Sequence, residues 1–202
     1  AIKREEDLAA AVAGLRLPAL LKTATLGYDG KGQLPVDSLE QARAAFAQLG
    51  ERPCVLEEKV QLAQELSVVL ARGADGEIAV YPVGENVHRN GILHTTRIPG
   101  CIAPGVAELA IGMAQRVAAE LDYVGVLAVE FFFTSDGELL INEMAPRPHN
   151  SGHYTLDACA TSQFEQQVRA LSGLPLGSTR LLSPVTMLNL LGDVWGDSQP
   201  DW

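Results

Sequence analysis

The spacing of apolar residues along the chain predicts four amphipathic helices. They cover residues 5–13, the segment from a Ser38 cap to Gly50, the segment after Pro104-Gly105 to Leu121, and the segment from a Ser162 cap to Gly173. Both serines precede a glutamine or glutamate at capping-box spacing, Gln41 and Glu165. We expect the third helix to bury Val106, Leu109, Met113 and Val117, and the fourth to bury Phe164, Val168 and Leu171.

Short apolar runs between turn residues predict strands. These runs cover residues 19–23, 54–58, 65–72, 77–82, 85–89, 92–96, 124–133 and 138–143, and residues 181–191 are also β-like. Asn90-Gly91 and Asp136-Gly137 are typical of two-residue hairpin turns. Because helices are interleaved with these hairpins, the pattern indicates an α+β fold with largely antiparallel strands.

Two acidic residues stand out in the last predicted hairpin. A two-residue turn at Asp136-Gly137 places Glu130 directly opposite Glu143. Opposed carboxylates destabilise a sheet unless a cation lies between them, and Mg²⁺ commonly takes one or two carboxylates together with phosphate oxygens. Asn142 alternates to the other face of an ideal strand, so it would join them only with a local twist or a bulge. The alternative is a solvated acidic face at a sheet edge.

A glycine-rich loop follows the predicted strand that contains Lys22. Gly27, Gly30 and Gly32 allow tight turns that aim amide groups at an anion, although the spacing is neither a P-loop nor a dinucleotide motif. A hairpin tip without a ligand is the alternative. An unpaired Lys22 ammonium would be costly in an apolar strand, so a phosphate is a natural partner, as a structural carboxylate would be.

Composition limits the classes of function. The chain has 202 residues, 47% hydrophobic and 20% charged, and no apolar run reaches the roughly 20 residues of a membrane helix. The net charge of −10 argues against a nucleic-acid partner. Three scattered cysteines without zinc spacing predict reduced thiols and a cytoplasmic location.

Polar segments beside these strands offer further binding groups. Glu57–Val60 followed by Glu65 could present backbone groups to an adenine and a carboxylate to a ribose, although an exposed charged turn is the default interpretation. A lone His88 on a strand is more often structural. His149 and His153 have helical zinc spacing, but Pro146 and Pro148 exclude a regular helix there. The same loop offers hydrogen-bond donors: Arg147, His149, Asn150 and Ser151.

Taken together, these groups resemble the nucleotide site of the ATP-grasp superfamily, in which two α+β lobes with largely antiparallel sheets hold ATP. Two motifs, Tyr28-Asp-Gly-Lys-Gly-Gln33 and Asn142-Glu-Met-Ala-Pro-Arg-Pro-His-Asn-Ser-Gly-His153, are similar to those of the N5-carboxyaminoimidazole ribonucleotide synthase family. The likeness runs from about Leu17 to Gly192.

The resemblance implies a role for each matching residue. Lys22 would contact the ATP phosphates, and the loop of Gly27, Tyr28, Asp29, Gly30, Lys31, Gly32 and Gln33 would close over them. The adenine hinge would be Glu57, Glu58, Lys59 and Val60, with Glu65 on the ribose and His88 in the pocket. Glu130 and Glu143 would bind Mg²⁺ beside Asn142. The catalytic and substrate-binding residues would be Asp29, Lys31, Arg147 and His149.

The resemblance also implies an activity and a domain plan. The family carboxylates 5-aminoimidazole ribonucleotide with ATP and bicarbonate through carboxyphosphate, and is a homodimer. We expect an ATP-grasp domain over residues 1–180, with the phosphate-loop lobe in residues 18–60, and the start of a C-terminal β domain at 181–202. Family members also have an N-terminal domain and a complete C-terminal domain, so we expect groups from those parts to be missing here.

Two other functions stay open at this point. A formate-dependent glycinamide ribonucleotide transformylase has a similar Pro-Arg-Pro-His loop, although Tyr28-Asp29-Gly30 and Asn150–His153 favour the carboxylating family. A nucleotide-binding ATP-grasp fragment without turnover is the other alternative. Phosphate release that depends on bicarbonate or on formate would separate the two enzymes.

Overall fold

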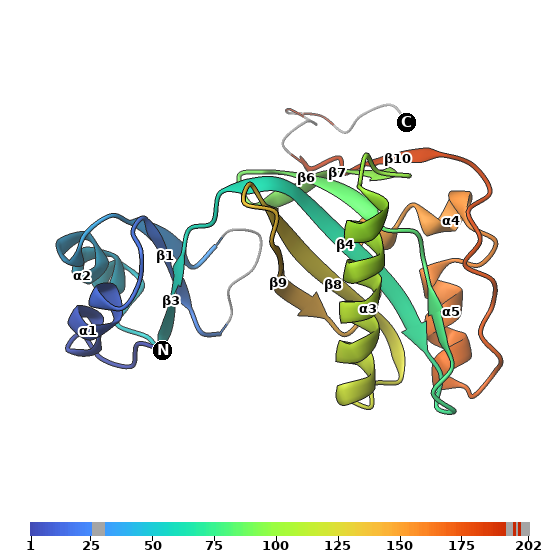
Figure 1. Ribbon diagram of the computed structural model, residues 1–202, viewed down its shortest axis with the longest axis horizontal. Helices are drawn as coiled ribbons and strands as arrows, with labels where there is room; N and C mark the ends of the chain where they lie inside the picture. Colours follow the sequence, from blue (N-terminus) through green and yellow to red (C-terminus); the bar gives the residue numbers. More distant parts are fainter. Residues whose placement is uncertain (26–30, 193–195, 197, 199–202) are drawn as a thin grey trace. The chain divides into compact units, whose positions relative to one another are not determined.

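The chain forms two separately packed units in the computed structural model (Figure 1), which describes residues 1–25, 31–192, 196 and 198. Unit 1 comprises Ala1–Gln61 with Asn90–Ile92, and unit 2 comprises Leu62–Arg89 with Leu93–Trp202. Four residues of the predicted glycine-rich loop, Gly27, Tyr28, Asp29 and Gly30, lie outside the described residues.

Unit 1 is a three-stranded antiparallel sheet covered by two helices. Its elements are α1 (Asp7–Ala13), β1 (Ala19–Thr23), β2 (Gln33–Val36), α2 (Leu39–Gln48) and β3 (Cys54–Glu58), and the strand order is β2-β1-β3. Leu8, Leu21 and Phe46 are buried together between the helices and the sheet. Because side chains alternate along β1, Lys22 lies on the other face of the strand from Leu21.

Unit 2 is built on a larger sheet. Its elements are β4 (Leu62–Arg72), β5 (Ile78–Val80), β6 (Gly84–Arg89), β7 (Ile92–Ile98), α3 (Pro104–Glu120), β8 (Gly125–Thr134), β9 (Leu139–Ala145), the 3-10 helix η1 (Asn150–Gly152), α4 (Thr155–Ala158), α5 (Gln163–Leu171) and β10 (Val185–Leu188). The strand order is β10-β7-β6-β4-β8-β9, with β5 paired to β4. The sequence therefore predicts the α+β class correctly, and it misses β2.

Helices cover both faces of the large sheet (Figure 1). Leu66 and Val68 of β4 pack with Ala110 of α3 on one face. Val69 of β4 packs with Tyr154, close to α4, on the opposite face. Odd-numbered residues of β4 therefore share the face that carries α4 and the segment leading into it.

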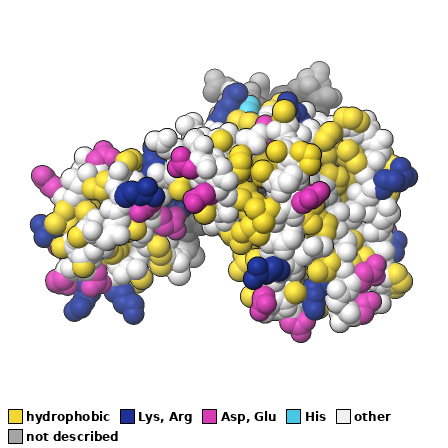
Figure 2. All heavy atoms as spheres, viewed as in Figure 1, with side chains coloured by type: hydrophobic (Ala, Val, Ile, Leu, Met, Phe, Trp, Pro, Cys, Tyr) yellow, Lys and Arg dark blue, Asp and Glu magenta, His cyan; other side chains and the backbone are white. Residues whose placement is uncertain are grey.

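The predicted buried face of α3 is wrong in part. The fully buried residues of this helix are Ala110, Ala114 and Ala118, whereas Leu109 is 53% exposed. Three alanines at helical spacing let the helix backbone approach β4 and β8 closely, which turns Leu109 outward. Hydrophobic side chains are accordingly visible on the surface of unit 2 (Figure 2).

The predicted buried face of α5 is wrong throughout. Phe164, Val168 and Leu171 are exposed, whereas Gln163 and Gln166 are fully buried. The physical reason is backbone satisfaction, because Gln163 accepts from the His149 N–H at 2.9 Å and donates to the His149 carbonyl at 2.7 Å. The helix therefore turns its glutamine side towards the loop backbone in the interior, and its apolar side faces outward.

The two predicted hairpin turns differ in outcome. Asn90 and Gly91 both have positive φ, which confirms a two-residue turn between β6 and β7. The β8–β9 connection instead has three residues, because the Thr134 N–H donates to the Glu138 carbonyl. Gly137 takes the left-handed conformation in it, at φ 84°. The prediction of a two-residue turn at Asp136-Gly137 is therefore wrong.

Three further observations bear on the sequence predictions. No helix in the described part of the chain is long and apolar enough to cross a membrane. Cys54, Cys101 and Cys159 are free thiols. β10, from the β-like segment at residues 181–191, pairs with β7 in the sheet of unit 2. A separate β domain that begins at residue 181 stays a prediction.

Candidate functional site

One face of the unit 2 sheet carries a group of polar side chains where an apolar core would otherwise be expected. The pairs Glu65–Asn86, Ser67–Glu130 and Glu130–Glu143 are in direct register across β6, β4, β8 and β9. Residues in register have side chains on the same face, so these five lie together opposite the face that α3 covers. We call this group the polar face.

Glu130 is the most buried acid of the polar face, at 8% exposure. Burial is the main reason that its pKa rises to about 7, and the hydrogen bond and charge of Glu143 add to this rise. Its Oε1 atom has no hydrogen-bond partner. A buried carboxylate with an unused oxygen is suited to hold a cation.

A β-bulge brings the two carboxylates into register. Phe131 pairs with Ile141, and Glu130 pairs with Glu143, so Asn142 is the extra residue of β9. The three-residue turn alone would leave Glu143 out of register, and the bulge restores the pairing. The predicted opposition of Glu130 and Glu143 is thus confirmed, and of the two distortions considered for Asn142, a twist or a bulge, the strand has a bulge.

Glu65 and His88 form a pair beside these carboxylates. The Nδ1 atom of His88 lies 3.0 Å from Oε2 of Glu65, and the His88 backbone N–H donates to the same oxygen at 3.3 Å. On its other side, Nε2 of His88 lies 4.0 Å from Oε1 of Glu130. Burial opposes the charging of His88, but the hydrogen bond and charge of Glu65 outweigh it and raise the pKa of the imidazole.

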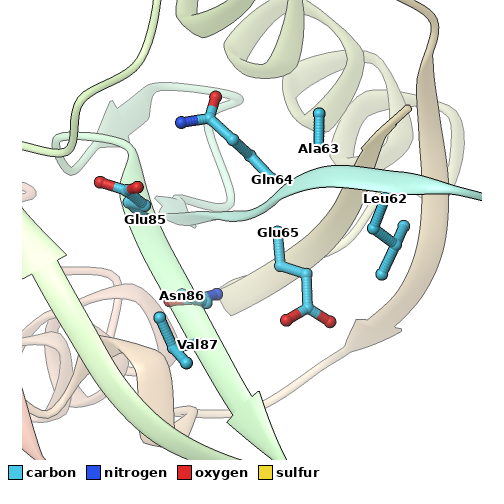
Figure 3. Close-up of a pocket in the computed structure, with 7 residues that line it drawn as sticks. All are labelled: Leu62, Ala63, Gln64, Glu65, Glu85, Asn86 and Val87. Atoms are coloured by element: carbon cyan, nitrogen blue, oxygen red, sulfur yellow. The ribbon is translucent and has the colours of Figure 1, made fainter. Parts of the chain in front are cut away.

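A small pocket of about 200 Å³ opens at the end of the polar face (Figure 3). Its lining residues come from adjacent stretches of β4 and β6: Leu62, Ala63, Gln64, Glu65, Glu85, Asn86 and Val87. Leu62 and Val87 are large apolar residues that remain 43% and 46% exposed. The pocket therefore combines exposed apolar surface with the carboxylate of Glu65 and the amide of Asn86.

Three buried side-chain atoms among the described residues have no hydrogen-bond partner: Asn86 Nδ2, Glu130 Oε1 and Asn150 Oδ1. Asn86 and Glu130 belong to the polar face, and Asn150 begins η1, which contacts β4. Each such atom costs about 1–3 kcal/mol unless a ligand or water pairs with it. Their concentration here makes the polar face the candidate binding site.

The loop after β9 holds His149 in its neutral form. Nδ1 of His149 accepts from the Ser151 N–H at 3.3 Å, so the ring proton resides on Nε2. Burial and then the charge of Arg147 lower the pKa of His149 to about 4. Arg147 itself is exposed, and its Nη1 donates to the Pro148 carbonyl. The loop presents a neutral imidazole and a guanidinium near Glu143.

Unit 1 contains the remaining predicted residues that the structure describes. The Nζ atom of Lys22 pairs with Oε2 of Glu57 at 2.5 Å, and Lys22 is only 27% exposed. Glu58 pairs with Arg16, which is why its pKa falls. The Lys59 N–H donates to the Pro18 carbonyl, and Gln33 pairs in register with Lys22. The sequence allowed either a phosphate or a structural carboxylate as the partner of Lys22, and in the structure a carboxylate, Glu57, is present.

Divalent-metal binding can be judged from the donors present. Glu130 and Glu143 supply hard oxygen ligands, and Glu130 has an unused oxygen. No group of three or more His, Cys, Asp or Glu side chains within the described residues could hold a metal ion. The pair thus fits Mg²⁺, which takes one or two carboxylates with phosphate oxygens, better than an all-protein metal cage.

Sequence reasoning missed several residues of the site. Ser67, Asn86 and Thr96 form a buried hydroxyl–amide cluster behind Glu65, and Gln163 anchors the backbone of His149. Strand alternation could have identified Asn86, which stands two positions before His88 and so shares its face. Nothing in the apolar pattern of α5 indicated Gln163.

Comparisons with known proteins match this chain to one family. An ATP-grasp domain model matches residues 1–164. The N5-carboxyaminoimidazole ribonucleotide synthase of Bacillus subtilis is 53% identical over 192 residues, and the alignment covers 95% of this chain and 50% of that protein. The synthase of Brucella melitensis is 49% identical over 94% of this chain and 53% of its own length.

Solved structures give the same result. An N5-carboxyaminoimidazole ribonucleotide synthetase in complex with ADP superposes with a TM-score of 0.89 at 50% identity, covering 95% of this chain and 51% of that one. The Aspergillus clavatus synthase in complex with ADP and 5-aminoimidazole ribonucleotide superposes with a TM-score of 0.86 at 31% identity, covering 95% and 51%. The chain spans about half the length of the curated relatives it matches.

Proposed function

The chain belongs to the ATP-grasp family, and we propose that it acts in the ATP-dependent carboxylation of 5-aminoimidazole ribonucleotide. The observation that carries the proposal is the polar face, where Glu130 and Glu143 oppose each other beside the Glu65–His88 pair. The similarity to N5-carboxyaminoimidazole ribonucleotide synthases supports the choice of substrate.

ATP is the proposed nucleotide, and the residues proposed to bind it are those that match the family's motifs. In unit 1, Lys22 would contact the phosphates, together with Lys31, Gly32, Gln33 and the residues outside the described range, Gly27, Tyr28, Asp29 and Gly30. The adenine hinge would be Glu57, Glu58, Lys59 and Val60. In unit 2, Glu65 would accept from ribose hydroxyls and His88 would line the pocket. Support comes from the half-buried Lys22 ammonium and from the pocket beside Glu65.

Glu130 and Glu143 would hold Mg²⁺, with Asn142 beside them at the bulge. When bound, the ion supplies positive charge to phosphate oxygens as a phosphoryl group is transferred. The chain's own contribution is a fixed pair of carboxylates, one buried and one exposed. Burial raises the pKa of Glu130, so a bound cation would also favour its ionised form.

The proposed reaction has two steps. A bicarbonate oxygen attacks the γ-phosphorus of ATP, and ADP leaves, which gives carboxyphosphate. The exocyclic amine of 5-aminoimidazole ribonucleotide then attacks the carboxyl carbon, phosphate leaves, and the amine loses one proton. Such transfers depend on positioning and charge stabilisation more than on a protein nucleophile.

Arg147 and His149 would position the small anionic reactants, with Asp29 and Lys31 on the substrate. The planar guanidinium of Arg147 suits a carboxylate or phosphate, and its exposure leaves it accessible. The neutral imidazole of His149 can donate from Nε2 because Nδ1 accepts from Ser151. An imidazole with a pKa of about 4 is already neutral at pH 7. His149 therefore does not have to lose a proton before it contacts a reactant.

Phosphate release from Mg·ATP is the experiment that tests the proposal. We expect release to require bicarbonate and to rise when 5-aminoimidazole ribonucleotide is added, with carboxylated product detected by mass spectrometry. Release that requires formate and glycinamide ribonucleotide instead would favour the transformylase. ATP binding without release under either condition would favour a nucleotide-binding module.

Four further properties belong to the same proposal. Bicarbonate is the proposed carbon source, and a homodimer is the proposed assembly, which light scattering would check. We also propose a cytoplasmic location, which the three free thiols support. The proposed domain plan assigns residues 1–180 to the ATP-grasp domain and residues 181–202 to the start of a C-terminal β domain.

A further inference from the structure

Asn86 has a side chain that is held at one end and unpaired at the other. It is only 4% exposed, and its Oδ1 accepts from the Thr96 hydroxyl at 2.9 Å and from the Ser67 hydroxyl at 3.5 Å. Its Nδ2 atom is buried and has no partner. The two hydroxyls therefore fix the direction in which the amide nitrogen points.

The backbone around this cluster leaves no spare room. A Cβ atom at Gly84 would lie 2.9 Å from Cγ2 of Thr96 and 3.1 Å from Oγ of Ser67. Both distances are shorter than side chains normally tolerate, so the absence of a side chain at Gly84 lets the two hydroxyls reach Asn86. The orientation of the amide is thus built into the packing of β4, β6 and β7.

The unpaired nitrogen lies beside a carboxylate at the pocket. Asn86 and Glu65 are in direct register on β6 and β4, and both line the pocket. Figure 3 shows the nitrogen end of Asn86 turned to the side on which the Glu65 carboxylate lies. The pair thus offers one hydrogen-bond donor next to one acceptor.

A donor beside an acceptor selects a particular ligand group. An amide N–H cannot ligate a cation, so its partner is a ligand acceptor atom. A hydroxyl both donates and accepts, so it satisfies Glu65 and Asn86 at the same time, whereas a phosphate oxygen would satisfy Asn86 and be repelled by Glu65.

We propose that Asn86 is a nucleotide-binding residue whose amide nitrogen donates to a ribose hydroxyl that Glu65 also binds, and that Thr96 is the positioning residue for this amide. The inference rests on the proposed nucleotide-binding function and deepens it. It makes the polar face selective for a sugar that carries the hydroxyl. A site that leaves a buried donor unpaired discriminates strongly against an analogue that lacks the matching group.

The test compares the affinities of ADP, 2′-deoxy-ADP and 3′-deoxy-ADP by titration calorimetry with Mg²⁺. We expect the wild-type protein to bind one deoxynucleotide about tenfold more weakly than ADP, the loss of a hydrogen bond to a buried group. Asn86→Ala should bind ADP about tenfold more weakly and should lose most of that preference, because its donor is gone. Asn189→Ala is the matched control, since Nδ2 of Asn189 already donates to the Leu93 carbonyl.

Thr96 supplies a second test that does not depend on the folding of Asn86→Ala. Thr96→Val should reduce the preference for ADP, and Thr96→Ser should restore it, because only serine keeps the hydroxyl. The double variant Asn86→Ala/Thr96→Val should show no further loss of preference if Thr96 acts through Asn86.

The outcomes are distinguishable. Retention of the wild-type preference by both Asn86→Ala and Thr96→Val would overturn the role of Asn86, as would a wild-type protein that binds ADP and both deoxynucleotides equally. A wild-type protein that binds none of the three nucleotides would instead contradict the proposed function itself.

Discussion

Glu143 lies directly opposite Glu130 across β8 and β9, although the turn between the strands is one residue longer than the sequence predicts. The bulge at Asn142 supplies the compensating residue. The three-residue turn and the bulge together therefore place the two carboxylates opposite each other. Such a pair destabilises the sheet unless a cation joins it, which makes it the centre of the proposed site.

Glu143→Gln should abolish Mg²⁺-dependent turnover and leave the fold intact. Because Glu143 is exposed and faces a like charge, the variant without metal should be as stable as the wild type or more stable by up to about 1 kcal/mol. Phosphate release and thermal unfolding measure the two effects. Glu138→Gln, an exposed acid before β9, is the matched control and should change neither. Near-wild-type turnover in Glu143→Gln would show that Glu143 does not bind the catalytic Mg²⁺.

Lys22→Met should weaken ATP binding about tenfold, because a charge-assisted contact to phosphate is lost. The half-exposed pair with Glu57 contributes at most about 1 kcal/mol, so the free energy of unfolding should change little. Calorimetric titration and urea unfolding provide both values. Arg43→Met, which removes an exposed pair with Glu5 in the same unit, should leave ATP binding unchanged. Equal ATP affinities for Lys22→Met and Arg43→Met would show that Lys22 is only a structural partner of Glu57.

His149→Asn should make unfolding less sensitive to acid. The folded-state pKa of His149 is lowered from 6.5 to about 4, so the native protein binds fewer protons than the unfolded chain between these values. The associated stability is fully present above pH 6.5 and is lost as the pH falls towards 4, amounting to about 3 kcal/mol. Asn keeps an acceptor for the Ser151 N–H but cannot become charged. Urea unfolding at pH 4.5 and 7 measures the difference, and identical pH slopes in both proteins would refute this account of His149.

Gln163→Ala should destabilise the protein by about 3 kcal/mol, because it leaves the backbone N–H and carbonyl of His149 unpaired. Val168→Ala, on the exposed side of the same helix, should cost less than about 0.5 kcal/mol. Urea unfolding of the two variants measures both losses. It therefore distinguishes the observed packing, which buries Gln163, from the apolar pattern of the sequence, which predicts that Val168 is buried. A larger loss in Val168→Ala than in Gln163→Ala would contradict the observed packing of α5.

The sequence predicted most of the secondary structure, because turn and capping signals are local. β1 and β3 begin and end at the predicted residues, and the Ser38 and Ser162 caps accept from Gln41 and Glu165 as expected. Helix faces were less predictable, since they depend on what a neighbouring segment offers. α5 buries Gln163 and Gln166 because the loops around His149 and Gly177 contain backbone groups that need partners.

The site was predictable where a residue type carries its own chemistry. Glu130 and Glu143 are opposed as expected, whereas the contact between Glu65 and His88 was not predicted. The partner of Lys22 was left open, because a carboxylate and a phosphate satisfy an ammonium equally well, and in the structure it is Glu57. Ser67 and Thr96 gave no signal, since their effect arises only when three strands bring them to Asn86.

The Mg²⁺ dependence of nucleotide binding shows whether Glu130 and Glu143 form a metal site. ADP affinity would be measured by titration calorimetry with and without Mg²⁺ for the wild-type protein and for Glu143→Gln. We expect Mg²⁺ to strengthen ADP binding to the wild-type protein at least tenfold and to leave the variant almost unaffected, because one carboxylate of the pair is missing. An equal strengthening in both proteins, or no binding of ADP by the wild type, would contradict this expectation.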